Sequence, residues 1–251
     1  MAKQKGILPI QGTIGNLTFV KTQDGFEVRA KGGVSAQRIA TDPAFERTRE
    51  NGAEFATAGK AGRILRNAFR SLLMNNTDAR LVSRLTGEMF SVMKEDNTSP
   101  RGQRSITAGD ITKLKGFEFN INGKLSQTVS AAFTTEVNRP LGELVITVAP
   151  FMPINKVVAP TGCTHFKLIA AGAEIDFDNM QFISDAKESI VLPWSNAMTN
   201  EITLTASVTP GSTLPLLLAL GIEFYQQRAG SYYALKTGAF NCLSLVEVSK
   251  P

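Results

Sequence analysis

Cys163 and His165 are the residues whose types could most readily support chemistry, because a thiolate and an imidazole can act as nucleophile and base or can bind zinc. His165 is the only histidine among the 251 residues, and Cys163 and Cys242 are the only cysteines. A structural zinc ion needs four ligands, and these residues supply three. No GxSxG sequence accompanies the histidine, so a Ser-His-Asp triad lacks its usual turn. We expect lone buried thiols, with a Cys163–Cys242 disulfide as the alternative.

Acidic residues recur at every second position in Glu174, Asp176 and Asp178. On an extended segment they would project from one side, which suits a calcium ion or the rim of a polar loop. The glycine and asparagine of an EF-hand loop are missing, which favours a solvated strand end. The chain also lacks the GxxxxGK[ST] and GxGxxG loops that cradle phosphates. We therefore predict no metal, no cofactor and no enzymatic activity.

Basic residues form the third candidate site. Arg63, Arg66 and Arg70 follow i, i+3, i+7 spacing and should share one helix face, and Arg80 and Arg84 follow soon after. Such a row suits phosphate contacts. It has no interleaved aromatic residues and no surrounding nucleic-acid-binding motif. A solvated face, or a face that pairs with acidic residues across an interface, is the favoured interpretation, and nucleic acid binding is the alternative.

The net charge of +5 is unevenly distributed along the chain. Residues 1–116 hold 19 Lys and Arg against 11 Asp and Glu, whereas residues 117–251 hold 8 against 11. This polarity would favour nucleic acid, an acidic surface, or head-to-tail attraction between copies of the chain. The longest apolar run, residues 214–222, is too short to span a bilayer. The N-terminal sequence lacks a Sec-type signal, so we expect a cytoplasmic or virion protein, with export by another route left open.

Residues 41–76 are predicted to form the helix around which the rest is organised. Asp42 is a suitable N-cap, and Pro43 suits the first helical position. The middle of this segment carries little side chain, and each glycine costs about 1 kcal/mol relative to alanine in a helix. Either another backbone approaches closely there, or the helix breaks near Gly59 or Gly62. We assign a packing surface to Gly52, Ala56 and Gly59.

The first residues of the chain are typical of β-structure. The sequence Gln23-Asp24-Gly25 carries the Asp-Gly signature of a tight hairpin, which predicts strands over residues 13–22 and 25–31. An isolated hairpin is at best marginally stable in water, so this arm must dock on its own chain or on a neighbouring molecule. The residues expected at that contact are Phe19, Phe26 and Val28.

The remainder of the chain is predicted as a short helical segment and a β domain. A second helix begins near Asp78 and forms an antiparallel helical hairpin with the first. We divide the chain into an N-terminal arm (1–40), a helical segment (41–96), a polar linker (97–115) and a β-sandwich (116–251). The fold class is α+β, with an antiparallel Ig-like sandwich and a jelly roll as its alternative. The candidate strands are 117–121, 125–134, 143–148, 166–173, 189–193, 201–208, 216–226 and 243–248.

Three stretches carry a resemblance to known proteins. GTIGNLTFVKTQDGFEVR is followed by DPAFERTRENGAEFATAGKAGR, and the chain closes with LGIEFYQQRAGSYYALKTGAFNCLSLVEV. This order resembles a widespread group of uncharacterised proteins from Bacteroidota with an N-terminal β-hairpin, a helical middle and an Ig-like C-terminal domain. The resemblance implies the same architecture and a non-enzymatic role, and it implies no site residues.

The predicted function is that of a non-enzymatic structural protein that assembles with copies of itself, as a filament, a tube or a virion component. Its partners would be further copies and other structural proteins of the same assembly. One alternative is an Ig-like module for glycan or protein ligands, in which aromatic residues line a sugar-binding face. The aromatic residues considered for that face are Trp194, Tyr225, Tyr232 and Tyr233.

Overall fold

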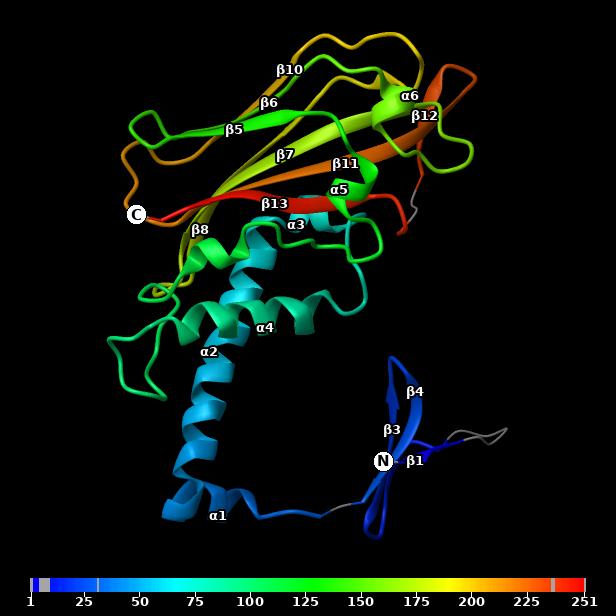
Figure 1. The fold of residues 1–251 in the computed structure, drawn as a ribbon. Coiled ribbons are helices and arrows are strands. Elements are labelled where there is room, and N and C mark those ends of the chain that lie inside the picture. Colours follow the sequence, from blue (N-terminus) through cyan, green and yellow to red (C-terminus); the bar gives the residue numbers. More distant parts are fainter. Residues whose placement is uncertain (1, 5–9, 31, 236–237, 251) are drawn as a thin grey trace. The chain divides into compact units, whose positions relative to one another are not determined.

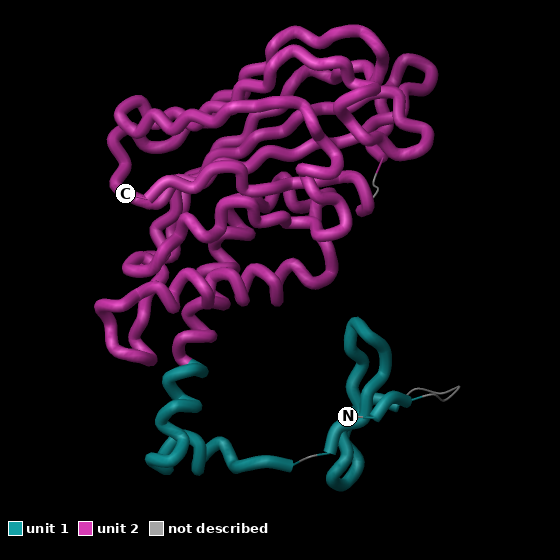
Figure 2. The backbone as a smooth tube through the Cα atoms, viewed as in Figure 1, with its two compact units in different colours: residues 1–52 teal, residues 53–251 magenta. Residues whose placement is uncertain are grey.

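The computed structural model describes residues 2–4, 10–30, 32–235 and 238–250, which divide into two compact units. The first unit comprises residues 1–52 and the second comprises residues 53–251 (Figure 2). The boundary falls inside the helix α2 (Glu46–Ala68), whereas the sequence suggested divisions after residues 40, 96 and 115.

The first unit contains a four-stranded antiparallel sheet in the order β1-β4-β3-β2. Its strands are β1 (Ala2–Lys3), β2 (Gly12–Ile14), β3 (Leu17–Thr22) and β4 (Gly25–Ala30). The hairpin between β3 and β4 is confirmed, with Thr22 paired to Gly25 across a two-residue turn. The predicted single strand over 13–22 is wrong, because Gly15, at a φ of 57°, turns the chain between β2 and β3. Residue 31, the predicted end of the partner strand, lies outside the described residues.

The predicted cap at Asp42 is confirmed. Its Oδ1 accepts a hydrogen bond from the amide of Ala44 at 2.9 Å, and Pro43 begins the 3-10 turn η1 (Pro43–Phe45) that leads into α2. A short helix, α1 (Ala36–Thr41), precedes it and was not predicted. The helix α2 runs without a break through all three of its glycines, and the chain bends only at Phe69, before α3 (Arg70–Leu73).

The second unit is built on two antiparallel sheets. The long strands β7 (His165–Asp176) and β11 (Leu216–Arg228) form the centre of the larger sheet. The shorter strands β8 (Gln181–Glu188), β9 (Leu192–Pro193), β12 (Ser231–Leu235) and β13 (Cys242–Ser249) pair with them. The smaller sheet contains β5 (Phe133–Asn138), β6 (Glu143–Val148) and β10 (Ile202–Ser207). Helices together with antiparallel sheets confirm the predicted α+β class.

Two apolar cores lie on opposite faces of the larger sheet, giving three layers (Figure 1). Leu168 and Ala170 of β7 face the smaller sheet, whereas Ile169 and Ala171 face the helices. The helical layer comprises α2, α3, α4 (Leu81–Lys94) and η2 (Ile111–Leu114). Because β7 and β11 are covered on both sides, their sequences are nearly continuous apolar runs instead of alternating ones. The helices complete this core, so they belong to the same unit as the sheets.

Two glycines lie where elements pack together, one between the two sheets and one between two helices of the helical layer. A Cβ at Gly172 of β7 would lie 2.6 Å from Leu144 Cδ1 and 2.9 Å from Ala206 Cβ, so the two sheets approach closely at a residue without a side chain. Gly62 of α2 lies against Leu85 of α4. The predicted antiparallel helical hairpin is wrong in its geometry, because α4 crosses α2 instead of running along it (Figure 1).

The predicted linker, residues 97–115, is an ordered loop in the helix-side core. Ile106, Ile111 and Leu114 are all buried there. The buried carboxylate of Asp96 accepts hydrogen bonds from the backbone of the loop, and Glu54 of α2 accepts one from the amide of Gly102 at 2.8 Å. These long-range bonds fix a segment whose polar composition is typical of a linker.

Several predicted strands differ from the observed ones. The strand predicted over 117–121 is reduced to the isolated bridge between Glu118 and Ser244, where residues 116–119 form three backbone hydrogen bonds with β13. The predicted strand over 125–134 begins instead as the helical turn α5 (Leu125–Thr128). A further turn, α6 (Pro153–Lys156), was not predicted, and neither were β8 and β12. The strands predicted near 143–148, 166–173, 201–208, 216–226 and 243–248 are present, with small shifts at their ends.

Candidate assembly surfaces

The sheet of the first unit has one apolar and one polar face. The register pairs Leu17 with Ala30 and Phe19 with Val28, and places Phe26 beside them on the same face. Ile14 of β2 and Ala2 of β1 extend this face, because they pair with Leu17 and Val28 respectively. We call these residues the apolar arm face: Ala2, Ile14, Leu17, Phe19, Phe26, Val28 and Ala30.

The opposite face is largely polar. It carries threonines, including Thr13 and Thr18, whose hydroxyl oxygens lie 3.2 Å apart. Arg29 and Glu27 form an ion pair of 3.0 Å there, and Val20 is its one large apolar side chain. This alternation is that of an antiparallel sheet that covers a core with one side only.

The described residues of the first unit do not bury the apolar arm face. None of the described residues in 1–52 is buried, and the side chains of Ile14 and Leu17 are 62% and 45% exposed. Phe19, Phe26 and Val28 are half-buried through contacts along the sheet, and the ammonium of Lys21 lies 5.7 Å from the centre of the Phe26 ring. The three residues predicted for this contact, Phe19, Phe26 and Val28, therefore lie together on one apolar face of the sheet.

The predicted packing surface on α2 is open within the chain. Gly52 and Ala56 are exposed, and a Cβ added at Gly52 or at Gly59 would meet no atom within 4 Å. The close approach that the sequence led us to expect occurs one turn later, at Gly62 against α4. Contact of Gly52, Ala56 and Gly59 with another molecule stays a prediction.

The structure does not bring the five predicted arginines together as one face. Arg84 lies in an internal network: it forms an ion pair with Asp78, donates to the carbonyl oxygen of Glu118 at 2.8 Å, and lies 5.1 Å from the centre of the Phe117 ring. The Nε of Arg66 donates to the carbonyl oxygen of Gly62 in its own helix.

The other three arginines are exposed, and they differ in position. Arg63 lines a groove with β8, Arg70 begins α3, and Arg80 precedes α4, where its amide donates to Asp78. Arg63 therefore combines exposure with a position on the wall of a groove.

The cysteine and histidine side chains do not form a catalytic pair. The thiol of Cys163 donates to the backbone carbonyl of His165, while the imidazole Nδ1 lies 2.9 Å from the hydroxyl oxygen of Thr164. Burial and the nearby Glu118 carboxylate raise the pKa of Cys242 to about 12, so its thiol is protonated at neutral pH. Both cysteines are free, but only Cys242 is buried as expected, whereas Cys163 is partly buried.

The acidic residues near position 175 are each engaged in the fold. Glu174 is buried and accepts a hydrogen bond from the amide of Thr209, and Asp178 accepts one from the hydroxyl of Thr107. Asp176 accepts three hydrogen bonds within its own turn, which keep its pKa below the ordinary value, those from Asn179 contributing most. Over the described ranges, no group of three His, Cys, Asp or Glu side chains is arranged to hold a metal ion.

The four aromatic residues considered for a sugar-binding face have different surroundings in the structure. Trp194 packs against the core between the sheets, and its Nε1 donates to the carbonyl oxygen of Val157. Tyr225 donates to Glu223, whereas Tyr232 and Tyr233 are exposed on β12.

Comparisons with known proteins give no relative on which to base a function. No family model, no curated protein and no solved structure matches the chain. The resemblance to the Bacteroidota group thus stays a prediction. None of the helices in the described residues is long and apolar enough to cross a membrane.

Sequence reasoning missed two sets of residues. The first is the pair of buried carboxylates, Glu54 and Asp96, whose partners lie in a loop that the sequence suggested was a linker. The second is the groove that Arg63 shares with Met180 and Phe182, which lies between segments more than 110 positions apart. No local pattern could have indicated that juxtaposition.

Proposed function

We propose that the chain is a non-enzymatic structural protein that assembles with copies of itself, as a filament, a tube or a virion component. The observation that carries the proposal is the apolar arm face, which the described residues of its own unit do not bury. In the proposed assembly a neighbouring copy covers this face. Covering a large aliphatic or aromatic side chain contributes roughly 1.5–3 kcal/mol, so the half-exposed members of this face together supply several kcal/mol per contact.

A four-stranded sheet needs such a cover for its own stability. Its backbone hydrogen bonds are made, but a sheet gains most of its stability when its apolar face packs against another layer. In the second unit both faces of β7 and β11 have such layers, and the first unit supplies none among its described residues. The proposal therefore assigns the missing layer to another molecule.

A second copy of the chain is favoured as that molecule by charge and by helix surface. The basic excess of residues 1–116 and the acidic excess of residues 117–251 attract each other between copies arranged head to tail. Gly52, Ala56 and Gly59 offer a helix surface onto which another backbone can pack closely, because no side chain intervenes.

We propose further that the two facing sheets of the second unit form an Ig-like sandwich, with the jelly roll as the alternative. Two antiparallel sheets that bury one core between them support this assignment. In the assembly this unit would form the outer surface. An experimental structure whose strand connections match neither type would contradict the assignment.

The test compares two valines of the arm sheet in the full-length protein. Val28→Lys places a charge on the apolar arm face, whereas Val20→Lys places the same charge on the polar face, opposite Glu27. Both valines are half-buried and lie inside a strand. Light scattering after size-exclusion chromatography, at high protein concentration and low salt, reports the mass of each species.

We expect oligomers for the unmodified protein and for Val20→Lys, and monomers for Val28→Lys. Monomers of the unmodified protein under these conditions, or equal masses for the two variants, would contradict the proposal. Hydrogen exchange of the β3 and β4 amides in Val28→Lys distinguishes loss of assembly from loss of the sheet itself.

A further inference from the structure

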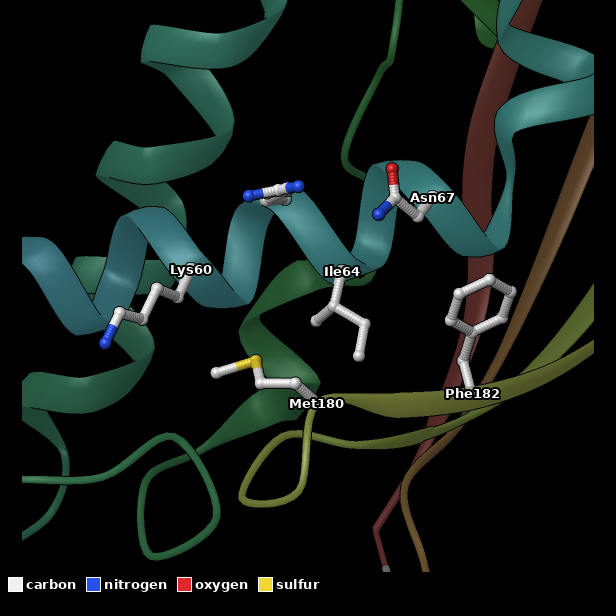
Figure 3. Close-up of a pocket in the computed structure, with 6 residues that line it drawn as sticks. Lys60, Ile64, Asn67, Met180 and Phe182 are labelled. Atoms are coloured by element: carbon white, nitrogen blue, oxygen red, sulfur yellow. The ribbon is translucent and has the colours of Figure 1, made fainter.

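A groove of about 370 Å³ lies between α2 and the start of β8 in the second unit. Lys60, Arg63, Ile64 and Asn67 of α2 line one side, and Met180 and Phe182 line the other. Ile64 points toward Met180 across the groove, and Phe182 stands on the strand beside it (Figure 3). The volume lies within the range of sites for small ligands, roughly 300–1,000 Å³.

The apolar part of the groove is accessible to solvent. Ile64 forms a floor that is only 4% exposed, whereas Met180 and Phe182 remain 40% and 41% exposed. Phe182 pairs in register with Ile175, so it lies on the face of the larger sheet that the helices cover. Met180, which precedes β8, and Phe182 of β8 thus leave a thioether and an aromatic side chain accessible to an apolar ligand.

The cationic part of the groove is not neutralised by an ion pair with any described residue. Across the ranges that the structure describes, neither Lys60 nor Arg63 forms an ion pair. The acidic residues that precede Met180 in its turn are already engaged, since Asp176 accepts hydrogen bonds from that turn and Asp178 accepts one from Thr107. An anion in the groove would therefore meet two cations whose charge nothing else compensates.

The backbone at Met180 supports a role for its side chain. Its φ is +55°, in the left-handed region that costs a residue with a Cβ about 1–2 kcal/mol relative to the right-handed one. Glycine adopts this conformation without that cost. A methionine side chain held here forms the groove wall opposite Ile64, which indicates that the wall is useful despite the backbone strain.

We propose that this groove binds a small organic anion with an apolar body, and that a carboxylate on an aliphatic chain is the class it fits. Arg63 and Lys60 hold the carboxylate, and the aliphatic chain lies on Ile64, Met180 and Phe182. Arginine suits this role because its guanidinium can donate two parallel hydrogen bonds to one carboxylate. The site is separate from the apolar arm face, so the proposal does not depend on self-assembly.

Calorimetric titration of the full-length protein with three probes tests the proposal. Octanoate carries both parts of the ligand, acetate carries only the anion, and 1-octanol carries only the apolar body. We expect saturable binding of octanoate and at least tenfold weaker binding of acetate and octanol.

Two substitutions separate the roles of the groove. Arg63→Gln should weaken octanoate binding about tenfold or more, whereas Arg70→Gln, an equally exposed arginine outside the groove, should leave it unchanged. Phe182→Ser should weaken octanoate binding as well, and a thermal melt of that variant verifies that it remains folded. Equal binding of octanol and octanoate, or equal effects at Arg63 and Arg70, would overturn the proposal, and so would no octanoate binding at all.

Discussion

The close packing of the two sheets at Gly172 makes a quantitative prediction for that residue. A methyl group at this position would lie 2.6 Å from Leu144 Cδ1, 2.9 Å from Ala206 Cβ and 3.4 Å from Leu144 Cβ. The end of the leucine side chain can rotate away, but the Cβ of Ala206 can move only with the backbone of β10. Most of the cost of Gly172→Ala therefore arises at Ala206.

The size of the effect follows from two opposing contributions. Forcing an extra methyl group into a packed core costs about 1–3 kcal/mol. Alanine in place of glycine inside a strand regains about 0.5–1 kcal/mol, because it restricts the unfolded chain. We expect Gly172→Ala to lower the free energy of unfolding by about 1–2 kcal/mol, measured by urea denaturation followed by circular dichroism.

Two further variants make this prediction refutable. Gly87→Ala, at an exposed position of α4 where a methyl group meets no atom within 4 Å, should instead raise the free energy of unfolding by about 1 kcal/mol. The double variant Gly172→Ala/Ala206→Gly moves the methyl group from β10 to β7. Its loss of unfolding free energy should therefore differ from the sum of the two single-variant losses by about 1 kcal/mol. Additive losses, or a stabilising Gly172→Ala, would refute the packing of β7 against β10.

Three other predictions concern polar and reactive residues. Arg139 donates four hydrogen bonds of 2.9–3.0 Å to Ser212, Leu214 and Ser249. Arg139→Lys keeps the charge but loses the planar guanidinium, so it should lower the free energy of unfolding by about 2 kcal/mol in urea denaturation. An unchanged urea midpoint would contradict this role of Arg139. Hydrogen bonds from Ser99 and then Thr98 lower the pKa of Asp96. Its contribution to stability is therefore complete above the ordinary carboxyl pKa and is lost as the pH falls below about 4. The urea midpoint of Asp96→Asn should depend less on pH between about pH 5 and 2 than the midpoint of the unmodified protein. Iodoacetamide at pH 8 should modify Cys242 only after unfolding, because burial raises the pKa of its thiol to about 12, and mass spectrometry of the native protein would detect any exception.

The sequence predicted those elements whose cause is local. The Asp-Gly turn gave the β3–β4 hairpin, and the pair Asp42 and Pro43 gave a capped helical start. The sequence also predicted β11, whose nearly continuous apolar run is typical of a strand that is buried on both faces. In each case the residues that determine the structure lie within a few positions of it.

The elements that sequence reasoning missed depend on distant residues. The strand β8 is largely polar because it lies at an edge of the larger sheet, so it lacks the apolar alternation by which strands are recognised. Polar composition in residues 97–115 suggested a linker, although Glu54, 48 positions from Gly102, satisfies part of its backbone. The sequence also could not distinguish Arg84 from the exposed arginines near it, because the carbonyl oxygen that Arg84 binds belongs to Glu118, 34 positions away.

The two units differ in how completely they bury their own apolar side chains. The cores on either side of the larger sheet are complete within residues 53–251, and the polar groups at their margins are bonded by Glu54, Asp96 and Arg139. The apolar arm face and the groove beside Arg63 each present several neighbouring apolar side chains that the described residues leave open, whereas residues such as Met74 and Ile190 are exposed elsewhere on the surface. Since exposing such surface costs free energy and the fold gains nothing from it, a binding partner is the physical reason to retain it. The arm face is broad and carries little charge, which suits another protein surface, whereas the groove is small and cationic, which suits a small anion.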